Sequence, residues 1–281
     1  MLKIGTSGFS FQDWLGTIYP RDLPKDQMLV YYANELKFDC VEINATYYAL
    51  MSQNMFSGML KKTAPGFEFV VKGFRGITHD PFDYRLKDKK PTIQKAEENT
   101  KKFAYSLQPL KQAGQLGGVL LQFPVFFTYT SQNQDYILKC QEWLDGAPLI
   151  IEFRNHAWAK EETYQFLRKN KLGFCVVDEP KLPRLMPFVN ITTSNTGYLR
   201  FHGRNPNWFK PAGSPANSGN APMKERYNYL YNDKELQEFL PEIAKLEKAT
   251  EKTYLFFNNC HMGFAAKNGL RLKDFLIQQG G

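Results

Sequence analysis

Carboxylate, guanidinium and imidazole side chains recur at alternate positions near the ends of short apolar segments. Glu152 and Arg154 end the segment PLIIEFR, and Arg200, His202 and Arg204 alternate with other residues in GYLRFHGR. Positioned carboxylates and histidines can transfer protons as general acids and bases. Arginines bind phosphate or carboxylate groups through two parallel hydrogen bonds. The pattern therefore predicts acid–base chemistry on an anionic substrate.

Other polar residues at similar places extend this candidate site. The residues predicted to act in proton transfer are Glu42, Glu152, Asp178 and His202, and His202 is expected to shuttle a proton near neutral pH. A second group is predicted to hold the anion, orient the substrate or offer an aromatic stacking surface. It consists of Asn44, Tyr47, Lys72, Gln122, Arg154, Trp158, Arg200, Arg204, Tyr229 and Asn258.

Eight short apolar segments must carry these side chains. Most intervals between them have apolar residues at helical spacing, and this alternation is typical of a parallel sheet. Eight such units predict an α/β protein with one domain over residues 1–281, a single (β/α)8 TIM barrel. The predicted strands are 3–8, 39–46, 68–74, 118–124, 148–154, 173–180, 197–204 and 253–259.

The intervals differ in character. The sixth contains Pro180, Pro183 and Pro187, which predict an irregular connection in place of a regular sixth helix. Long loops are predicted after strand 3, at 75–91, and after strand 7, at 205–232 with Trp208, and both are expected to act as lids. Two intervals are predicted to form helices with buried faces, made by Ile93, Ala96, Phe103, Leu107 and Leu110 and by Leu236, Phe239, Leu240, Ile243 and Leu246.

The direction of the polar side chains follows from the strand period. Side chains alternate between the two faces of a strand, and the outward face must be apolar to pack against helices. We therefore expect the polar set, Asp178 included, to point into the barrel and to gather at its C-terminal mouth. Barrel enzymes hold their active sites there.

Composition limits the class of protein. A hydrophobic content of 43% with 15% aromatic residues supports a large core and argues against disorder. The net charge of +8 suits an anionic partner, nucleic acid included, and equally an ordinary basic surface. The four cysteines form no C-x-x-C pair, and neither a signal peptide nor a membrane-spanning run is apparent. We expect a cytoplasmic protein with no membrane partner.

A metal site is the weaker interpretation of the same residues. His79, His156, His202 and His261 all lie at or beyond predicted strand ends, where carboxylates could complete a set of ligands. However, no H-x-x-x-H or H-x-E spacing occurs, and neighbouring arginines would repel a cation. We assign no metal ligand and leave the cofactor open, with a divalent metal as the less favoured alternative.

Several motifs together resemble the DUF72 family, also called YecE-like. They are GTSGF at 5–9 with Trp14, VEINATYY at 41–48, FVVK at 69–72, LLQFP at 120–124, EFRNHAW at 152–158, YLRFHGR at 198–204, YNYLY at 227–231 and FFNN at 256–259. One departure is His156-Ala157 before Trp158, where the family often has a serine before the tryptophan. The resemblance spans nearly the whole chain and implies one (β/α)8 barrel of the bacterial and archaeal cytoplasm. It implies no activity.

Three functions remain open from the sequence. The favoured one is an enzyme of the hydrolase or phosphodiesterase type that acts on a small anionic or phosphorylated substrate or one derived from nucleic acid. The second is a ligand- or nucleic-acid-binding protein that uses the same pocket without catalysis. The third is a glycoside hydrolase that uses two of the predicted carboxylates, whose separation would distinguish retention from inversion.

Overall fold

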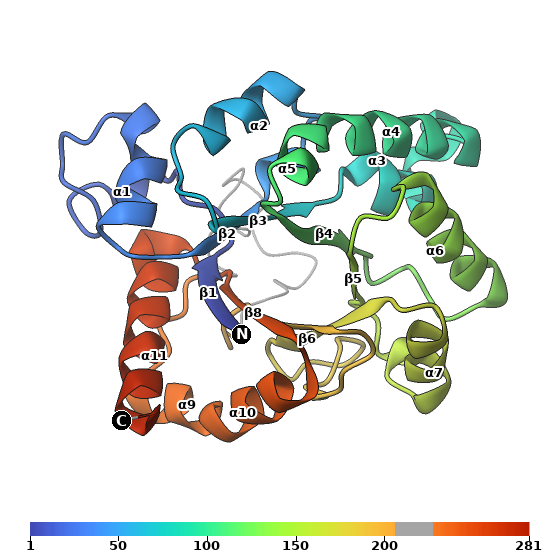
Figure 1. Ribbon diagram of the computed structural model, residues 1–281. Helices are drawn as coiled ribbons and strands as arrows, with labels where there is room; N and C mark the ends of the chain where they lie inside the picture. The colour runs from blue at the N-terminus through green and yellow to red at the C-terminus, as the bar shows by residue number, and fades with distance from the viewer. Residues whose placement is uncertain (206–226, 281) are drawn as a thin grey trace, which may run out of the picture.

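Eight parallel strands form the centre of the computed structural model, which describes residues 1–205 and 227–280 (Figure 1). They are hydrogen-bonded in the order β1-β8-β7-β6-β5-β4-β3-β2, and a bridge between Ser7 and Glu42 links the two end strands. The predicted TIM-barrel fold is confirmed. The strands are β1 Leu2–Thr6, β2 Cys40–Ile43, β3 Glu68–Lys72, β4 Leu116–Gln122, β5 Leu149–Glu152, β6 Gly173–Asp178, β7 Thr196–Phe201 and β8 Lys252–Phe257.

Helices surround the barrel and cover the outer face of the strands (Figure 1). Threonines at two helix starts satisfy free backbone amides: Thr92 accepts from the amide of Lys95, and Thr130 accepts from that of Asn133. The α-helices are α1 Met28–Asn34, α2 Gln53–Leu60, α3 Arg75–Thr78, α4 Ile93–Ser106, α5 Gln108–Gln112, α6 Ser131–Trp143, α7 Glu161–Lys169, α9 Asp233–Glu238, α10 Leu240–Ala249 and α11 Phe264–Gly280.

Both predicted helical faces pack on the barrel, but each is divided between two helices. Pro109 near the start of α5 separates it from α4, and Pro241 near the start of α10 separates it from α9. Proline fits the first turn of a helix and cannot continue the helix before it. The predicted core residues are buried except Ile93, whose side chain is 42% exposed, so that prediction was wrong.

The connections after β3 and β6 position the mouth. Residues 179–195, all of them described, form turns and extended segments without a helix, as the three prolines predict. The connection at 75–91 is not a structureless loop, because it contains α3 and the short 3₁₀ segments Asp80–Phe82 and Tyr84–Lys89. Phe82 fixes it to the barrel by edge-on contact with Phe127, at a centroid distance of 4.7 Å. Residues 206–226, with Trp208, lie outside the described residues.

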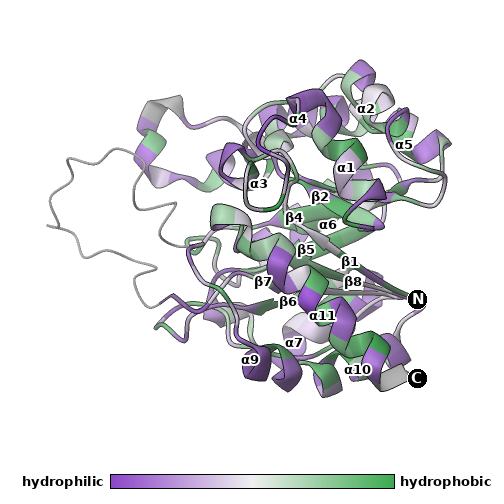
Figure 2. Ribbon diagram, turned by 90° about the vertical axis from the view of Figure 1, so that its left-hand side faces the viewer, coloured by the Kyte–Doolittle hydropathy of each residue, from purple (hydrophilic) through white to green (hydrophobic). Residues whose placement is uncertain are grey.

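Apolar side chains fill the space between the strands and the helices. Figure 2 shows the hydrophobic colour concentrated along the strands and the hydrophilic colour on the outer sides of the helices. Inside the barrel, near the N-terminal ends of the strands, the Tyr254 hydroxyl donates to Glu68, which also accepts from Lys252 at 2.6 Å. The lower barrel is therefore packed, and the polar residues of its C-terminal half lie above a solid core.

Candidate functional site

Glu152, at the end of β5, is surrounded by cationic and polar groups. Its Oε2 accepts a hydrogen bond from Nη1 of Arg200 at 2.6 Å, and its Oε1 lies 2.6 Å from Nε of Arg154. Nε2 of His202 lies 3.2 Å from the same Oε1. Glu152, Arg200 and His202 have no exposed surface. Buried charges persist when they are paired, so these groups form a closed layer of paired charges beneath the mouth.

Glu42, in β2, completes this layer from the other side of the barrel. Its Oε1 accepts from Nη2 of Arg200 at 2.6 Å, and its Oε2 accepts from the Tyr198 hydroxyl at 2.7 Å. The same Nη2 is 3.3 Å from Oγ of Ser7. One guanidinium thus binds two carboxylates. Arg200, which was expected to hold a substrate anion, instead holds Glu42 and Glu152.

The environment of Glu152 and His202 determines their protonation. Burial alone would raise the pKa of Glu152, but Arg154 and Arg200 outweigh burial and hold it well below its usual range. Burial, aided by the charge of Arg154, holds the pKa of His202 well below its usual range. We therefore expect His202 to be neutral at neutral pH, which argues against its predicted role as a proton shuttle there. Glu152 is a weak base for the same electrostatic reason.

The tautomer of His202 follows from its second contact. Asn258 donates from Nδ2 to Nδ1 of His202 at 2.9 Å, so the neutral ring carries its hydrogen on Nε2 and donates it to Glu152. Asn258 is almost fully buried. Asn258 therefore orients the imidazole, where the sequence predicted that it would orient a substrate.

Glu179 is a site residue that sequence reasoning missed. Nη1 of Arg154 donates to its Oε2 at 2.5 Å, and the amide of Met186 donates to its Oε1 at 3.1 Å. Burial raises the pKa of Glu179 to about 7, against the opposing charge of Arg154. The signal was present in the sequence VVDEP, where two acids are adjacent and only one of them can share the inner face with Cys175.

Asp178 points to the opposite face, which corrects its place in the catalytic set. It accepts from Nε of Arg204 at 3.0 Å and from the Tyr231 hydroxyl at 2.5 Å. Arg204 also lies 3.7 Å from Glu235 and 3.6 Å from Glu238 in α9. The sequence predicted that Arg204 points into the barrel. It points outward because Gly203, at a φ of +88°, interrupts the alternation of side chains between the two faces of the strand. These residues form a separate ion-pair cluster beside α9.

Tyr229 lies next to this outer cluster. Its hydroxyl donates to Glu235, and its Cβ would be 2.7 Å from a Cβ added to Gly203. Tyr229 is partly exposed, so its predicted contact with a substrate stays a prediction.

Lys72, the last residue of β3, is held inside the mouth by neutral groups. Nζ donates to Oε1 of Gln122 at 2.8 Å and lies 4.9 Å from the centre of the Tyr47 ring. Within the described part of the chain, no carboxylate oxygen lies within 4.0 Å of this ammonium group. Burial, reinforced by the charge of Arg200, lowers the pKa of Lys72 to about 7. The structure thus brings together Lys72, Gln122 and Tyr47 as predicted.

Trp158 belongs to the core and not to an aromatic rim. Its ring is stacked on Phe153 at 4.1 Å and on Phe127 at 5.6 Å, and its Nε1 donates to the carbonyl of Phe127 at 2.7 Å. Trp158 has no exposed surface. Its indole therefore offers no face to a ligand, and the stacking role expected for it is corrected.

Two further observations concern metals and membranes. In residues 1–205 and 227–280, no group of three or more histidine, cysteine, aspartate or glutamate side chains is arranged to hold a metal ion. Within the same ranges, every helix is too short or too polar to cross a membrane.

The comparisons with known proteins agree with this architecture. A family model described as "Protein of unknown function DUF72" matches residues 3–280. The UPF0759 protein YunF of Bacillus subtilis is 30% identical over 288 residues, which cover 98% of this chain and 95% of that protein.

Solved structures give the same result. A DUF72 family protein from Thermotoga maritima superposes with a TM-score of 0.85 at 41% identity, over 99% of both chains. One from Enterococcus faecalis has a TM-score of 0.81 at 28% identity, over 99% of this chain and 96% of that one. A D-allulose 3-epimerase from Methylomonas, at 11% identity and a TM-score of 0.50, is similar in fold alone.

Proposed function

We propose that this chain, which belongs to the DUF72 family, is an enzyme that performs acid–base chemistry on a small, phosphorylated anion at the C-terminal mouth of its barrel. The observation that carries the proposal is the position of Lys72. The residue as a whole is half-buried, and its ammonium group has a neutral hydrogen-bond acceptor where the other inward cations have carboxylates. A substrate anion would supply the missing counter-charge.

The other cations predicted to hold the anion are already engaged. Arg154 binds Glu152 and Glu179, Arg200 binds Glu42 and Glu152, and Arg204 binds Asp178. Opening one of these buried pairs would expose an uncompensated carboxylate, at a cost of about 3–5 kcal/mol. Anion binding at the mouth is therefore assigned to Lys72, and the arginine–carboxylate pairs keep the surrounding groups in place.

Anion binding and proton transfer are coupled at this lysine. With a pKa of about 7, Lys72 exists as amine and as ammonium in comparable amounts near neutral pH. An anion beside Nζ favours the ammonium form and raises this pKa, so binding draws a proton onto the lysine. In the complex Lys72 is therefore an ammonium group, which can donate a proton to the bound substrate as a general acid and is left as the neutral amine. Gln122 directs Nζ throughout.

The carboxylate pair required by a glycoside hydrolase is not favoured by the geometry. Glu42 and Glu152 have no exposed surface, and both bind the guanidinium group of Arg200. Neither can approach a glycosidic bond without losing that partner.

The binding part of the proposal is tested with pyrophosphate. Calorimetry on the whole protein at pH 6 and pH 8.5 should give tighter binding at the lower pH, and Lys72→Met should abolish binding at both. Lys139→Met, which changes an exposed lysine of α6, should bind as the wild type does. Unchanged binding by Lys72→Met would overturn the assignment. A single-stranded oligonucleotide used in place of pyrophosphate tests the nucleic-acid-derived substrate, whose binding must weaken with added salt.

The catalytic part needs a separate measurement. A mixture of sugar phosphates and nucleotides is incubated with the wild type or with Lys72→Met and followed by ³¹P NMR. Conversion by the wild type alone supports the proposal. Pyrophosphate binding without conversion of any phosphorylated compound would instead favour the binding-protein interpretation.

A further inference from the structure

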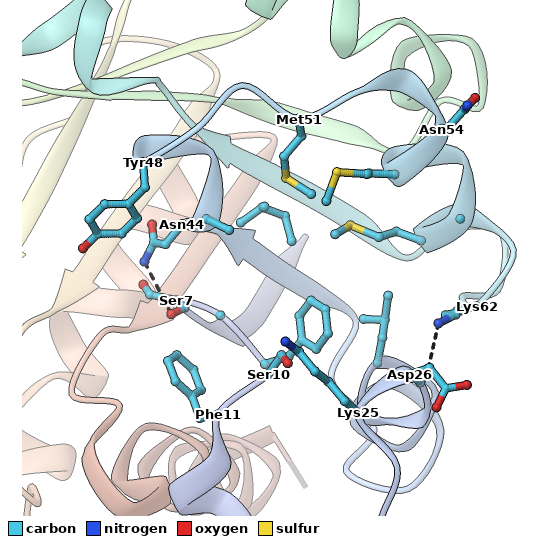
Figure 3. Close-up of a pocket in the computed structure, with 18 residues that line it drawn as sticks. Ser7, Ser10, Phe11, Lys25, Asp26, Asn44, Tyr48, Met51, Asn54 and Lys62 are labelled. Atoms are coloured by element: carbon cyan, nitrogen blue, oxygen red, sulfur yellow. Dashed lines mark hydrogen bonds between the residues drawn. The ribbon is translucent and has the colours of Figure 1, made fainter.

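A cavity lies beside the mouth, between α2 and the chain that leads into α1. It has a volume of about 910 Å³, within the range of ligand-binding pockets. Its walls come from the residues after β1 and β2, from the 3₁₀ segment Lys25–Gln27 with Leu29 of α1, and from one face of α2 (Figure 3). Neither Lys72 nor Glu152 lines it, and Ser7, which lies 3.3 Å from Nη2 of Arg200, separates the cavity from the charged layer. This cavity is therefore distinct from the site proposed above.

The lining of this cavity is mainly apolar and adaptable. Three methionines follow one another at intervals of four residues, Met51, Met55 and Met59, and Figure 3 shows the Met51 side chain directed into the space. Leu29 and Ile43 face them. Methionine has an unbranched, polarisable side chain that adjusts to ligands of different shape. The surface suits a flexible hydrocarbon body.

A glycine in α2 keeps the cavity open. Gly58 lines it four residues after Asn54, which also lines it, so the two positions share a face of α2; Lys62 lies in the turn that follows the helix. A Cβ added at Gly58 would meet no atom within 4 Å. Glycine inside a helix costs about 1 kcal/mol relative to alanine. No atom of the described chain would clash with a side chain at this position, so the effect of the glycine is to leave the cavity unfilled.

The two ends of the cavity differ in polarity. Figure 3 shows Lys62 beside Asp26 at one end, Ser7 and Asn44 at the other, and the Lys25 side chain extending from the Asp26 end toward Ser10. Nζ of Lys62 donates to the backbone carbonyl of Asp26 at 2.7 Å, which directs the ammonium group without neutralising it. In the described ranges, neither Lys25 nor Lys62 has a carboxylate oxygen within 4.0 Å. With two lysines and one aspartate, the charged residues of the lining carry a net positive charge.

We propose that this cavity binds an amphipathic anion, with an apolar chain against Met51, Met59 and Leu29 and its anionic head group held by one of the two lysines, Lys25 or Lys62. The apolar body fits the methionine-lined walls, and the head group fits the unneutralised lysines. Asn44, which the sequence placed in the substrate site, lines the opposite end of this cavity. The proposal does not rest on the function assigned to Lys72.

The test compares ligands that differ only in their head group. Calorimetry measures the binding of decanoate, decyl phosphate and 1-decanol below their aggregation concentrations. Both anions should bind at one site, and at least one of them about fivefold more tightly than decanol. The ratio of the two anions distinguishes a carboxylate from a phosphate head group. Equal affinities for the two anions and decanol would overturn the role of the lysines.

Two sets of variants locate the ligand. Gly58→Leu should fill the cavity and weaken decanoate binding by about tenfold or more, although the helix itself gains propensity. Lys25→Met combined with Lys62→Met should reduce decanoate affinity to that of decanol and leave decanol unchanged. Gly58→Ala is the control for folding, and Lys72→Met is the control for the mouth and should bind decanoate normally. If folded Gly58→Leu binds decanoate as the wild type does, the cavity is not the site.

Discussion

Nη2 of Arg200 lies 2.6 Å from Oε1 of Glu42, and this contact joins β7 to β2 through the barrel interior. Two strands, β8 and β1, separate these strands in the sheet. Because the other terminal nitrogen, Nη1, binds Glu152, the guanidinium connects three strands at one level. The mouth therefore rests on a layer of paired charges, in which Arg200 serves as the counter-charge of two carboxylates.

Replacing Arg200 should destabilise the protein strongly. Arg200→Met leaves the carboxylates of Glu42 and Glu152 buried without their shared partner, and we expect the free energy of unfolding to fall by about 3–5 kcal/mol in urea denaturation. Arg168→Met, which removes an exposed ion pair with Glu161, should cost less than about 1 kcal/mol. If the two variants lose similar stability, the layer does not hold the barrel together.

Much of this layer could be predicted from the sequence, because strand alternation has a strict period of two. Glu42, Glu152, Arg200 and His202 all lie inside the barrel as that period requires. Their roles could not be predicted. Whether an inward arginine binds a substrate or a neighbouring carboxylate depends on distances between strands that are far apart in the chain.

The sequence-based predictions were wrong where the alternation of side chains along a strand could not choose between residues, or where the strand had ended. In the Asp178–Glu179 pair, alternation allows only one inward acid, and the sequence interpretation chose the wrong one. Past the end of β7, the left-handed conformation of Gly203 turned Arg204 outward. The cavity beside α2 was not predicted, because segments from two different βα units create it.

His202 should remain neutral throughout the physiological pH range. Burial and the charge of Arg154 hold its pKa well below its usual range, so its ring nitrogens should show no titration between pH 8 and pH 5.5 in ¹⁵N-detected NMR. The spectrum should also identify the Nε2–H tautomer, because Nδ1 accepts from Asn258. A titration midpoint near pH 6.5 would restore His202 as a proton shuttle.

Lys72 should make the stability of the protein depend on pH. Its pKa is about 7 when folded and about 10.5 when unfolded, so the unfolded chain binds more protons between these values. This group therefore lowers stability fully below pH 7, and its penalty disappears as the pH rises toward 10.5. Lys72→Met should be more stable than the wild type by about 1 kcal/mol at pH 6, with a smaller advantage at pH 9. Urea denaturation measures this difference, and a difference independent of pH would contradict the lowered pKa.

Substitutions of Trp158 distinguish a role in core packing from a role in stacking on a ligand. Since Phe153 and Phe127 stack on its indole and no part of it is exposed, Trp158→Ala should lose about 3–5 kcal/mol of stability by thermal or urea denaturation. Trp158→Phe keeps the stacking but loses the hydrogen bond to the carbonyl of Phe127, so it should lose about 1–3 kcal/mol.

The folded Trp158→Phe variant should bind pyrophosphate with wild-type affinity, because the indole has no surface at the mouth. Tyr48→Ala, which truncates a ring that is 63% exposed, should change stability by less than about 0.5 kcal/mol. A Trp158→Phe variant with normal stability and weakened anion binding would return the indole to the site.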